Sequence, residues 1–434
     1  MRVFIAQKYE LGERWDPMMV AYRRNLSHFK YQPVSLASLL ISPPQYGANE
    51  SGIKRISEQQ VRYIRITDIN DNGLLNNNLG ATVERINAKY ILNHNDLLFA
   101  RSGATVGKTF LYKKNLYNYP CLFAGYLIKF QLNPSIVIPD YLFIYTQLSS
   151  YKDWIIATQR AAAQPNINAE EYKSLQVPLP PLTVQNKIYE IYHFAVLNKQ
   201  KKEQEAKDLL DSIDDYLLSE LGIERPERTE NGRFFYTSFH NIMGEELAPL
   251  SVKNKGKQSK STLYKETKLS TIATIEKGQA ITSKDIISGD YPVIAGGQSS
   301  PYNHNQYNYK GNVVTVSASG AYSGYVWYHD YPIFASDCSV IYSKDEKVYL
   351  TKYIYEILHL RQQEIYLLQK GAGQPHVYAS DLAQITIPVV SIEKQMEIIL
   401  HCNNLRIAAA ELTQEGKNLV ESAKITIEAM ILGE

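Results

Sequence analysis

Positions spaced alternately by four and three residues, most of them apolar, run through a long stretch of the chain from Leu182 to Leu221. This is the spacing of the a and d positions along a coiled-coil seam. The stretch therefore predicts a helix of about 40 residues, roughly 60 Å long. Globular helices average about 11–12 residues, so a helix of this length is typical of a spacer.

The same register returns 210 residues later in the chain. The text in front of the two stretches also matches at this offset, because Gln164-Pro165 aligns with Gln374-Pro375 and Pro178 with Pro388. The chain is therefore a tandem repeat. One shared register predicts that the two helices pack on each other, the alternatives being a local hairpin or a homodimer zipper. The seam is assigned to Ile188, Tyr192, Ala195, Leu209, Ile213, Ile398, Leu405, Leu412 and Leu419.

The segments in front of the helices contain short runs of β-branched and aromatic residues broken by glycine, asparagine and proline, which predicts strands. Each segment also has one helical stretch, at residues 141–158 and 351–368. The two segments share a Ser-Gly-Ala landmark, at residues 102–104 and 319–321, but differ in loop length and in most surface residues. Two domains that share their pattern of elements but differ in surface residues are expected to perform the same task on different targets.

These patterns divide an α+β chain into five segments. A β-rich N-terminal domain covers residues 1–181, and a spacer helix covers residues 182–222. Residues 223–267 form a polar linker with the start of the second repeat, where residues 244–252 echo residues 12–20. A second β-rich domain covers residues 268–391, and the distal spacer helix covers residues 392–434.

Composition places the chain among globular proteins, since 44% of its 434 residues are hydrophobic and 21% are charged. It has neither an apolar run of about 18 residues nor a charged-then-apolar leader, so we expect a cytoplasmic protein that does not cross a membrane. Three cysteines without a C-x-x-C pair argue against disulfides and a zinc knuckle. The net charge of +2 does not by itself indicate a nucleic-acid partner.

Motifs for catalysis and nucleotide binding are missing from the sequence. Residues 103–109 resemble a phosphate-binding P-loop, but three residues separate the glycines where that loop needs four. A tight turn with glycine at positive φ explains both this segment and its counterpart at residues 320–325. No nucleophile elbow, His-Glu-x-x-His pair, carboxylate-rich metal loop or Asn-Pro-Pro-aromatic motif occurs. We therefore expect neither a catalytic residue nor a metal site.

The duplicated arrangement resembles the specificity (S) subunit of a type I restriction–modification enzyme, over essentially the whole chain. The resemblance is carried by the paired Ser-Gly-Ala-x-x-Gly turns, the paired Gln-Pro dipeptides, and the helix starts that contain Gln185 and Gln395. The second copy departs from the first in having Val390-Ser391 where Pro180-Pro181 stand. The resemblance implies two target-recognition domains, each followed by a long helix, with the helices packed as an antiparallel coiled coil in pseudo-two-fold symmetry.

The resemblance also implies a non-catalytic subunit that recognises a bipartite, asymmetric site in double-stranded DNA. Its implied partners are two modification subunits, which methylate adenine with S-adenosylmethionine, and ATP-driven restriction subunits. S-adenosylmethionine, ATP and Mg²⁺ would be held by those partners and no cofactor by this chain. Linking two readers on one spacer raises their effective concentration, so each need bind only modestly.

Candidate DNA contacts are polar residues in loops near the shared glycine turns and the helix starts, where side chains can reach base edges or phosphates. At each position the alternative is a solvated loop residue. For Gln164 and Gln374 we instead expect side-chain hydrogen bonds that hold the junction of domain and helix. The candidates in the first domain are Arg101, Ser102, Thr105, Lys108, Lys113, Lys114, Arg160 and Asn166. Those in the second are Gln298, Tyr302, Asn303, His304, Asn305, Tyr322, Lys370 and His376.

Three other functions fit parts of the pattern. A solitary DNA-binding regulator or adaptor with two recognition domains would bind its site tightly without a methyltransferase. A purely structural coiled-coil protein would bind no DNA, and two divergent β-rich units argue against it. A methyltransferase with its own recognition domain would bind S-adenosylmethionine alone, but its catalytic motifs are missing.

Overall fold

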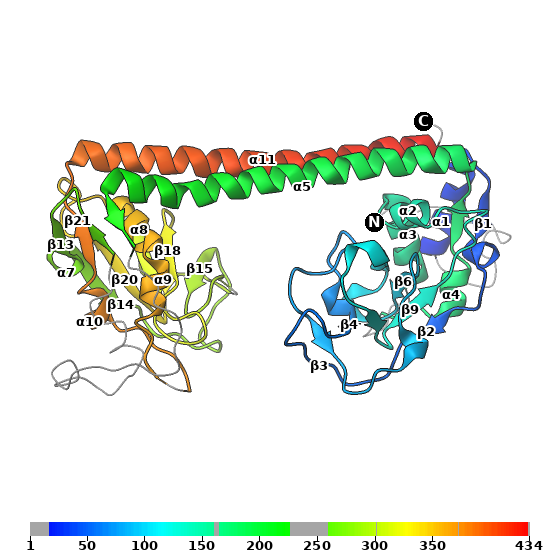
Figure 1. Cartoon of the computed structure of the whole chain (residues 1–434), viewed down its shortest axis with the longest axis horizontal. Helices are drawn as coiled ribbons and strands as arrows, with labels where there is room; N and C mark the ends of the chain where they lie inside the picture. Colours follow the sequence, from blue (N-terminus) through cyan, green and yellow to red (C-terminus); the bar gives the residue numbers. More distant parts are fainter. Residues whose placement is uncertain (1–16, 160–164, 226–258, 301, 372, 433–434) are drawn as a thin grey trace. The chain divides into compact units, whose positions relative to one another are not determined.

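The computed structural model describes residues 17–159, 165–225, 259–300, 302–371 and 373–432. The chain divides into two compact units, residues 1–203 with 413–434 (unit 1) and residues 204–412 (unit 2). Each unit contains one sheet-rich domain and about half of each of two long helices, α5 (Leu182–Leu221) and α11 (Ile392–Leu432) (Figure 1). The predicted fold class, two β-rich domains each followed by a long helix, is confirmed.

The main sheet of each unit has four antiparallel strands in the same order. In unit 1 the order is β2 (Gln45–Tyr46), β9 (Leu127–Phe130), β6 (Leu97–Ala100) and β7 (Thr109–Leu111). In unit 2 it is β14 (Ala273–Lys277), β20 (Cys338–Ser343), β17 (Val313–Ser317) and β18 (Val326–His329). In both sheets the last strand of the chain lies between the first and the second, and the second and third strands form a hairpin. The duplication therefore extends to sheet topology.

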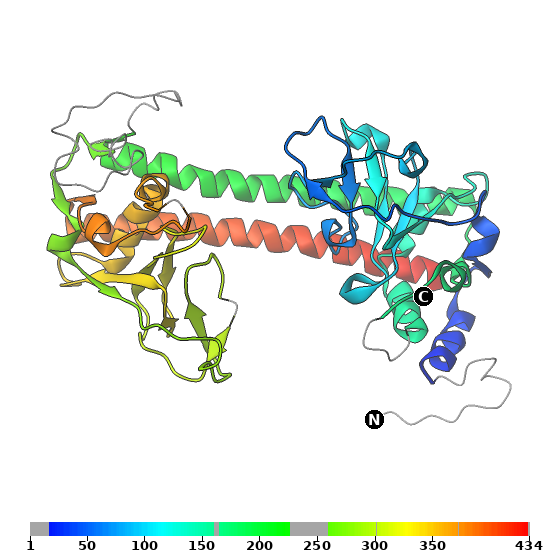
Figure 2. The ribbon, with the colours of Figure 1, turned by 90° about the horizontal axis from the view of Figure 1, so that it is seen from below.

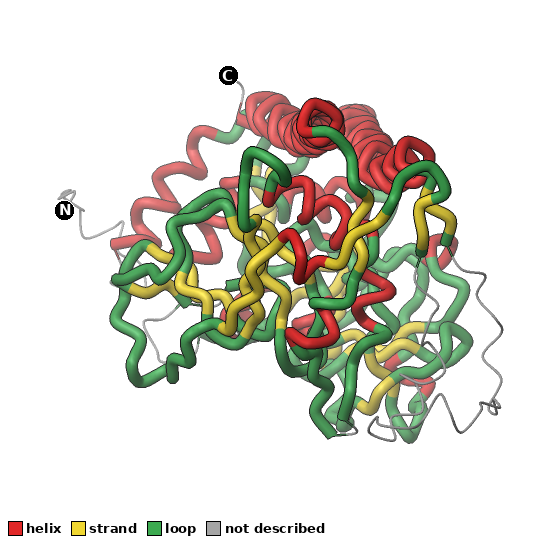
Figure 3. Tube along the Cα trace, turned by 90° about the vertical axis from the view of Figure 1, so that its left-hand side faces the viewer, coloured by secondary structure: helices red, strands yellow, loops and turns green. Residues whose placement is uncertain are grey.

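A second sheet in each unit contains one parallel pair of strands. In unit 1 its order is β3 (Ile53–Lys54), β5 (Ala81–Thr82), β4 (Arg62–Ile64) and β8 (Cys121–Phe123), with β4 and β8 parallel. In unit 2 its order is β16 (Asn303–His304), β15 (Tyr291–Ile294) and β19 (Phe334–Ala335), with β15 and β19 parallel. Loops beside these strands are drawn green in Figure 3, and the segments between the strands differ in length between the two units.

Shorter helices pack beside the sheets. Unit 1 has α1 (Pro17–Asn25), α2 (Pro139–Tyr145), α3 (Ser149–Thr158), α4 (Ala169–Lys173) and six 3₁₀ helices (Leu26–His28, Leu36–Leu39, Ile66–Asp68, Ala88–Tyr90, Gly103–Thr105, Lys114–Leu116) among its described residues. Unit 2 has α7 (Leu269–Ile272), α8 (Thr351–Leu360), α9 (Gln362–Tyr366) and α10 (Ala379–Leu382). The single helices predicted at 141–158 and 351–368 are each divided in two. In unit 1 the division follows Thr146, whose hydroxyl donates to the Phe143 carbonyl at 2.6 Å, and Leu148, whose backbone is extended.

Each long helix leaves its domain through a short antiparallel strand pair. In unit 1, β1 (Pro33–Ser35) pairs with β10 (Gln176–Pro178), which leads into α5. In unit 2, β13 (Glu266–Lys268) pairs with β21 (Thr386–Pro388), which leads into α11, and β11 (Ile223–Glu224) pairs with β12 (Lys260–Ser261) after α5 ends. The domain cores continue onto the helices, because Ile188 and Ile427 belong to the same core cluster as Phe99, Tyr141 and Trp154. Burial of this apolar surface fixes each domain to its part of the helix pair.

Within each unit, the parts of the two long helices lie side by side and run antiparallel (Figures 1 and 2). In unit 1 the first half of α5 packs on the second half of α11, and in unit 2 the second half of α5 packs on the first half of α11. Gly416 permits close approach in unit 1, because a Cβ there would lie 3.4 Å from the Cα atom of Lys199. Lys202 lies beside the seam and pairs with Glu415 at 2.5 Å.

The seam follows the predicted register for most of its length and then shifts by one residue. Ile188, Tyr192, Ala195, Ile213 and Ile398 are buried, and Leu209, Leu405 and Leu412 are partly buried. Leu419 was assigned wrongly, because it is 38% exposed whereas Val420 is 5% exposed. Ile427 and Ile431 continue this shifted face, as Leu217 and Leu221 do in α5. The cause is helix geometry: a straight helix drifts about 20° per heptad, so a second step of four returns the buried face to its partner.

Candidate nucleic-acid interface

The Ser-Gly-Ala turns join the hairpin strands of the two main sheets and are held in the same way. Ser102 forms an isolated antiparallel bridge with Asn166, and the Gly103 amide donates to the Pro165 carbonyl at 3.0 Å. In unit 2, Ser319 forms such a bridge with His376, and the Gly320 amide donates to the Pro375 carbonyl at 3.1 Å. The segment after each Gln-Pro dipeptide therefore clamps the glycine turn of its own domain.

Glycine is required at both turns because the backbone is left-handed there. Gly103 and Gly107 have φ of 72° and 88°, and Gly320 and Gly324 have φ of 87° and 95°. Residues other than glycine rarely adopt this backbone conformation. The interpretation of these segments as glycine turns is confirmed. Nothing lies within 4 Å of a Cβ built on Gly103, so a ligand can approach this part of the backbone closely.

Two of the candidate lysines in unit 1 already have carboxylate partners. Lys108 pairs with Asp71 at 2.7 Å and lowers the pKa of that carboxyl through this hydrogen bond and its charge. Lys113 pairs with Asp140 at 2.6 Å and donates to the Asn95 side chain at 2.7 Å. Their charges hold loops against the domain, which leaves them less suited to contact DNA.

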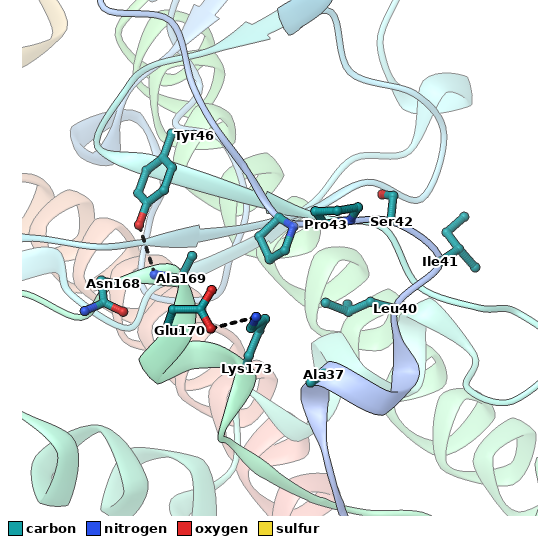
Figure 4. Close-up of a pocket in the computed structure, with 11 residues that line it drawn as sticks. Ala37, Leu40, Ile41, Ser42, Pro43, Tyr46, Asn168, Ala169, Glu170 and Lys173 are labelled. Carbon is teal, nitrogen blue, oxygen red and sulfur yellow. Dashed lines mark hydrogen bonds and ion pairs between the residues drawn. The ribbon is translucent and has the colours of Figure 1, made fainter.

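Arg101 is different, because in the described part of the chain no carboxylate pairs with it. Its guanidinium carbon lies 5.0 Å from the centroid of the Tyr46 ring, and its Nε atom is buried without a hydrogen-bond partner. Tyr46 is itself fixed, since its hydroxyl accepts a hydrogen bond from the Ala169 amide at 3.1 Å across an open pocket (Figure 4). A stacked guanidinium keeps its in-plane donors available for an acceptor. Unit 2 has Ala318 at this place in the repeat.

The remaining unit 1 candidates near the turn are polar loop residues. Lys114 and Asn166 are exposed, Thr105 is partly buried, and Ser102 is buried. Arg160 and Gln164 lie outside the described residues. The residues echoed between 12–20 and 244–252, and most of the linker at 223–267, also fall largely outside them.

The unit 2 candidates separate into an exposed group and a structural group. His304 is buried and its Nδ1 atom accepts a hydrogen bond from the Ile287 amide at 3.1 Å, which leaves it less suited to contact DNA. Lys370 pairs with Asp381 at 2.9 Å, and the His376 ring stacks on Tyr378. The exposed candidates are Gln298, Tyr302, Asn303, Asn305 and Tyr322.

The junctions of domain and helix are held by Gln185 and Gln395. The Gln185 side chain accepts from the Ile138 amide at 2.8 Å and donates to the carbonyls of Ile136 and Pro180 at 3.2 and 2.8 Å. Gln395 makes the same three bonds in unit 2, with Leu350, Val348 and Val390 at 2.8, 2.9 and 3.2 Å. Both side chains are buried, whereas Gln374 is exposed. The sequence contained this signal, because both glutamines follow a proline-containing strand at the same offset.

An ion pair to a buried carboxylate joins α11 to the domain of unit 2. The Arg406 guanidinium donates to both carboxylate oxygens of Glu356 on α8, at 2.7 and 2.6 Å. Lys352 lies 4.0 Å from the same carboxylate and 4.0 Å from the centroid of the Tyr328 ring. Removing one partner of such a pair leaves an uncompensated buried charge, which is strongly destabilising. The pair therefore fixes the orientation of this helix on its domain.

Sequence reasoning missed one group of candidates, in the loop between β4 and β5. This loop contains Asn70, Asn72, Asn76, Asn77 and Asn78, and two buried arginines, Arg55 and Arg62, bind its backbone. The signal in the sequence was the density of asparagine, a residue suited to reading adenine.

The described residues also lack certain kinds of site. Among them, no three histidine, cysteine or acidic side chains lie together as metal ligands. Nor does any helix in the described ranges have both the length and the apolar character needed to span a bilayer. The cysteines Cys121, Cys338 and Cys402 are buried free thiols, and burial raises the pKa of each to about 12.

Comparisons with known proteins found similar sequences and structures. A curated relative, the Type I restriction enzyme MjaVIII specificity subunit of Methanocaldococcus jannaschii, is 25% identical over 132 residues, and the match spans 28% of this chain and 29% of that relative. A solved structure from work on complex assembly and conformational transition of the type I R-M system has a TM-score of 0.53 at 14% identity, covering 93% of this chain and 96% of that chain. The S subunit of the type I restriction-modification system from M. genitalium has a TM-score of 0.46 at 14% identity, with 93% and 96% coverage.

The family described as Type I restriction modification DNA specificity domain matches the chain twice, at residues 50–207 and 262–422. Each match begins within one sheet-rich domain and ends within the long helix that follows it. Since the two matches together cover well over half of the sequence, the chain belongs to the family of type I restriction–modification DNA specificity domains and carries that domain in two copies.

Proposed function

We propose that this chain is the DNA-specificity subunit of a type I restriction–modification system and recognises a bipartite, asymmetric site in double-stranded DNA. The observation that carries the proposal is that the two units share one backbone architecture but differ in their exposed residues. Both units have the same sheet order, the same clamped glycine turn and the same junction glutamine. The exposed residues near the turns differ, so each unit would read its own half-site.

Readout would follow the division of labour that is general in protein–DNA complexes. Contacts to phosphates set the position of the protein, and contacts to base edges in the major groove supply the specificity. In unit 1 the stacked Arg101 guanidinium is the best placed of the predicted contacts, since Lys108 and Lys113 are already paired. In unit 2 the exposed Tyr302, Asn303 and Tyr322 take this role.

The chemistry would lie in partner chains. We propose that two modification subunits bind this chain and methylate adenine with S-adenosylmethionine, and that restriction subunits add an activity driven by ATP and Mg²⁺. The chain itself would be non-catalytic and act in the cytoplasm. Support for docked partners comes from apolar side chains on the outer faces of the long helices. Leu197 and Ile407 hold corresponding places in the two helices and are 49% and 57% exposed, and Phe194 is 69% exposed. Exposed apolar groups of this kind suit an interface.

Two other apolar residues of these helices, Tyr189 and Ile399, do not belong to this outer face. They are partly buried and pack against the domain cores. The proposed docking surface in unit 1 is therefore formed by Phe194 and Leu197, and that in unit 2 by Met396, Leu400 and Ile407.

The test is the adenine methylation pattern of the host with and without this gene, measured by methylome sequencing. The proposal expects one bipartite motif to disappear when the gene is deleted and to return when the gene is restored. An unchanged methylome, together with tight sequence-specific binding by the isolated chain, would instead identify a solitary DNA-binding regulator.

A further inference from the structure

Two buried arginines in the second sheet of unit 1, Arg62 at the start of β4 and Arg55 directly after β3, have no carboxylate partner in the described part of the chain. Arg55 and Arg62 are 1% and 4% exposed. Burying a charge is costly unless it is paired or fully hydrogen-bonded, and arginine cannot shed its proton. Arg62 is not fully satisfied, because its buried Nε atom has no partner among the described residues.

The two guanidinium groups bind the backbone of the loop between β4 and β5. Arg62 donates to the Asn76 carbonyl at 3.1 Å and to the Asn78 side chain at 3.2 Å. Arg55 donates to the Leu79 carbonyl at 3.1 Å. Tyr119 supports both, since Arg55 lies 3.9 Å from its ring centroid and Arg62 donates to its hydroxyl at 3.2 Å. Hydrogen bonds from a charged donor are about twice as strong as neutral ones, so this part of the loop is held rigidly.

Asn77 is the residue that this arrangement leaves outward. The Asn76 side chain donates back to the Thr67 carbonyl at 3.0 Å, and the Asn78 side chain is bound by Arg62. Asn77 lies between them, is exposed, and has no hydrogen-bond partner for its side chain among the described residues. A rigidly held loop that presents an exposed amide without a partner is preorganised for binding, because little ordering entropy remains to be lost.

The same loop is tied to the glycine turn of the main sheet. Lys108, at the end of that turn, pairs with Asp71 and donates to the Ile69 carbonyl at 3.4 Å. Gly73 packs so closely on Phe143 that a Cβ would lie 2.5 Å from that ring. The loop and the clamped turn therefore form one connected surface.

We propose that Asn77 is a specificity-determining residue of unit 1 and reads an adenine in the major groove, with Arg62 and Arg55 as the positioning residues that hold its loop. An asparagine amide matches adenine because it donates to N7 and accepts from the N6 amino group as a bidentate pair. The two guanidinium charges beneath the loop, which no carboxylate of the described chain offsets by pairing, favour the approach of the DNA backbone. This inference rests on the proposed function.

The test uses the full chain co-expressed with its modification subunits, with Asn77→Ala compared with Asn93→Ala. Asn93 is an exposed asparagine of the same domain that precedes β6, so it lies at the opposite end of this strand from the glycine turn. With Asn77→Ala, methylome sequencing and methylation of oligonucleotides should show about a 5- to 150-fold loss of discrimination at one A·T pair of one half-site. The other half-site and the motif of the Asn93→Ala complex should be unchanged.

The outcomes separate this inference from the function on which it rests. An active Asn77→Ala complex with the full motif, or a uniform loss of affinity for every sequence, would overturn the reading of a base by Asn77. A wild-type complex that neither binds nor methylates a bipartite site would overturn the proposed function itself.

The positioning role has its own readout. Arg62→Lys keeps the charge but loses the planar fork of donors that holds the loop. It should therefore reduce discrimination at the same base pair as Asn77→Ala does. A lower melting temperature with an intact motif would show that Arg62 supports the fold alone.

Discussion

The side-chain oxygen of Gln185, near the start of α5, accepts a hydrogen bond from the backbone amide of Ile138 at 2.8 Å. Its amide nitrogen donates to the carbonyls of Ile136 and Pro180. The buried glutamine thus satisfies one backbone amide and two backbone carbonyls. Gln395, near the start of α11, accepts from the Leu350 amide and donates to the carbonyls of Val348 and Val390 in the same way. One glutamine per repeat thus joins each recognition domain to the helix that follows it.

Gln185→Ala should lower the free energy of unfolding by about 2–3 kcal/mol, because it leaves the Ile138 amide and two carbonyls buried without partners. Chemical denaturation of the variant and of the exposed-site control Asn186→Ala measures the difference. Gln395→Ala should have an effect of similar size, since its surroundings are the same. A loss below about 0.5 kcal/mol, the usual range of surface substitutions, would mean that the junction is held by packing alone.

Unit 2 should lose stability in mild acid through His329. Burial lowers the pKa of His329 from 6.5 to about 4, and its Nε2 atom lies 2.8 Å from the Thr315 hydroxyl. The folded state thus holds the neutral ring while the unfolded state takes up a proton below pH 6.5, so stability is full above that value and falls as the pH drops towards 4. Burial lowers the pKa of His359 too, which acts in the same direction.

From these values, His329 alone contributes a loss of about 2 kcal/mol between pH 7 and pH 5. Denaturation of the wild type and of His329→Gln at both pH values tests this, because the variant lacks the titrating ring. Its stability should fall less over this interval, whatever its stability at pH 7. Equal pH dependence in the two proteins would show that His329 is not responsible.

The helices and the duplication were predictable from sequence because they depend on periodicity and repetition, which are visible in one chain. The one-residue shift at Leu419 was not, since it depends on how far a straight helix drifts from a seven-residue repeat. The sequence did not show that Lys108, Lys113 and His304 bind other residues of the chain, for a different reason. Their partners Asp71, Asp140 and Ile287 are distant in the sequence, so only the folded chain shows that these polar groups are already satisfied.

The outer faces of the long helices should bind the modification subunits, and we expect a complex with two methyltransferase chains per copy of this chain. Leu197→Asp and Ile407→Asp place a charge on exposed apolar positions of the two helices without touching the buried seam. Each variant should weaken one of the two attachments and leave the melting temperature nearly unchanged. Light scattering of co-purified complexes checks the stoichiometry. A wild-type chain that stays monomeric with its cognate methyltransferase would contradict the prediction.

The two recognition domains should be separable in function. Replacing residues 31–164 by the corresponding domain of a relative keeps the Gln185 junction and α5 of this chain. Because the units share a frame and differ in lining, we expect one half of the methylated motif to change and the other to remain. Methylome sequencing of the chimera gives the answer, and a simultaneous change in both halves would rule out independent readout.

The long helices should set the number of unspecified base pairs between the half-sites. Inserting seven residues after Ala206 and seven after Gly416, which are both buried seam positions in the part of the helices that follows the heptad, keeps the seam in register. It lengthens each helix by about 10 Å. B-DNA rises about 3.4 Å per base pair, so the gap should widen by up to about 3 base pairs, or by less if the helices lie obliquely to the duplex.

The half-site sequences should stay the same, because no residue of either domain is altered. The insertion also rotates the two domains relative to each other around the DNA, which should reduce activity without changing the preferred bases. Methylome sequencing of the insertion variant distinguishes these effects, and an active enzyme with an unchanged gap would show that the helices do not determine the spacing.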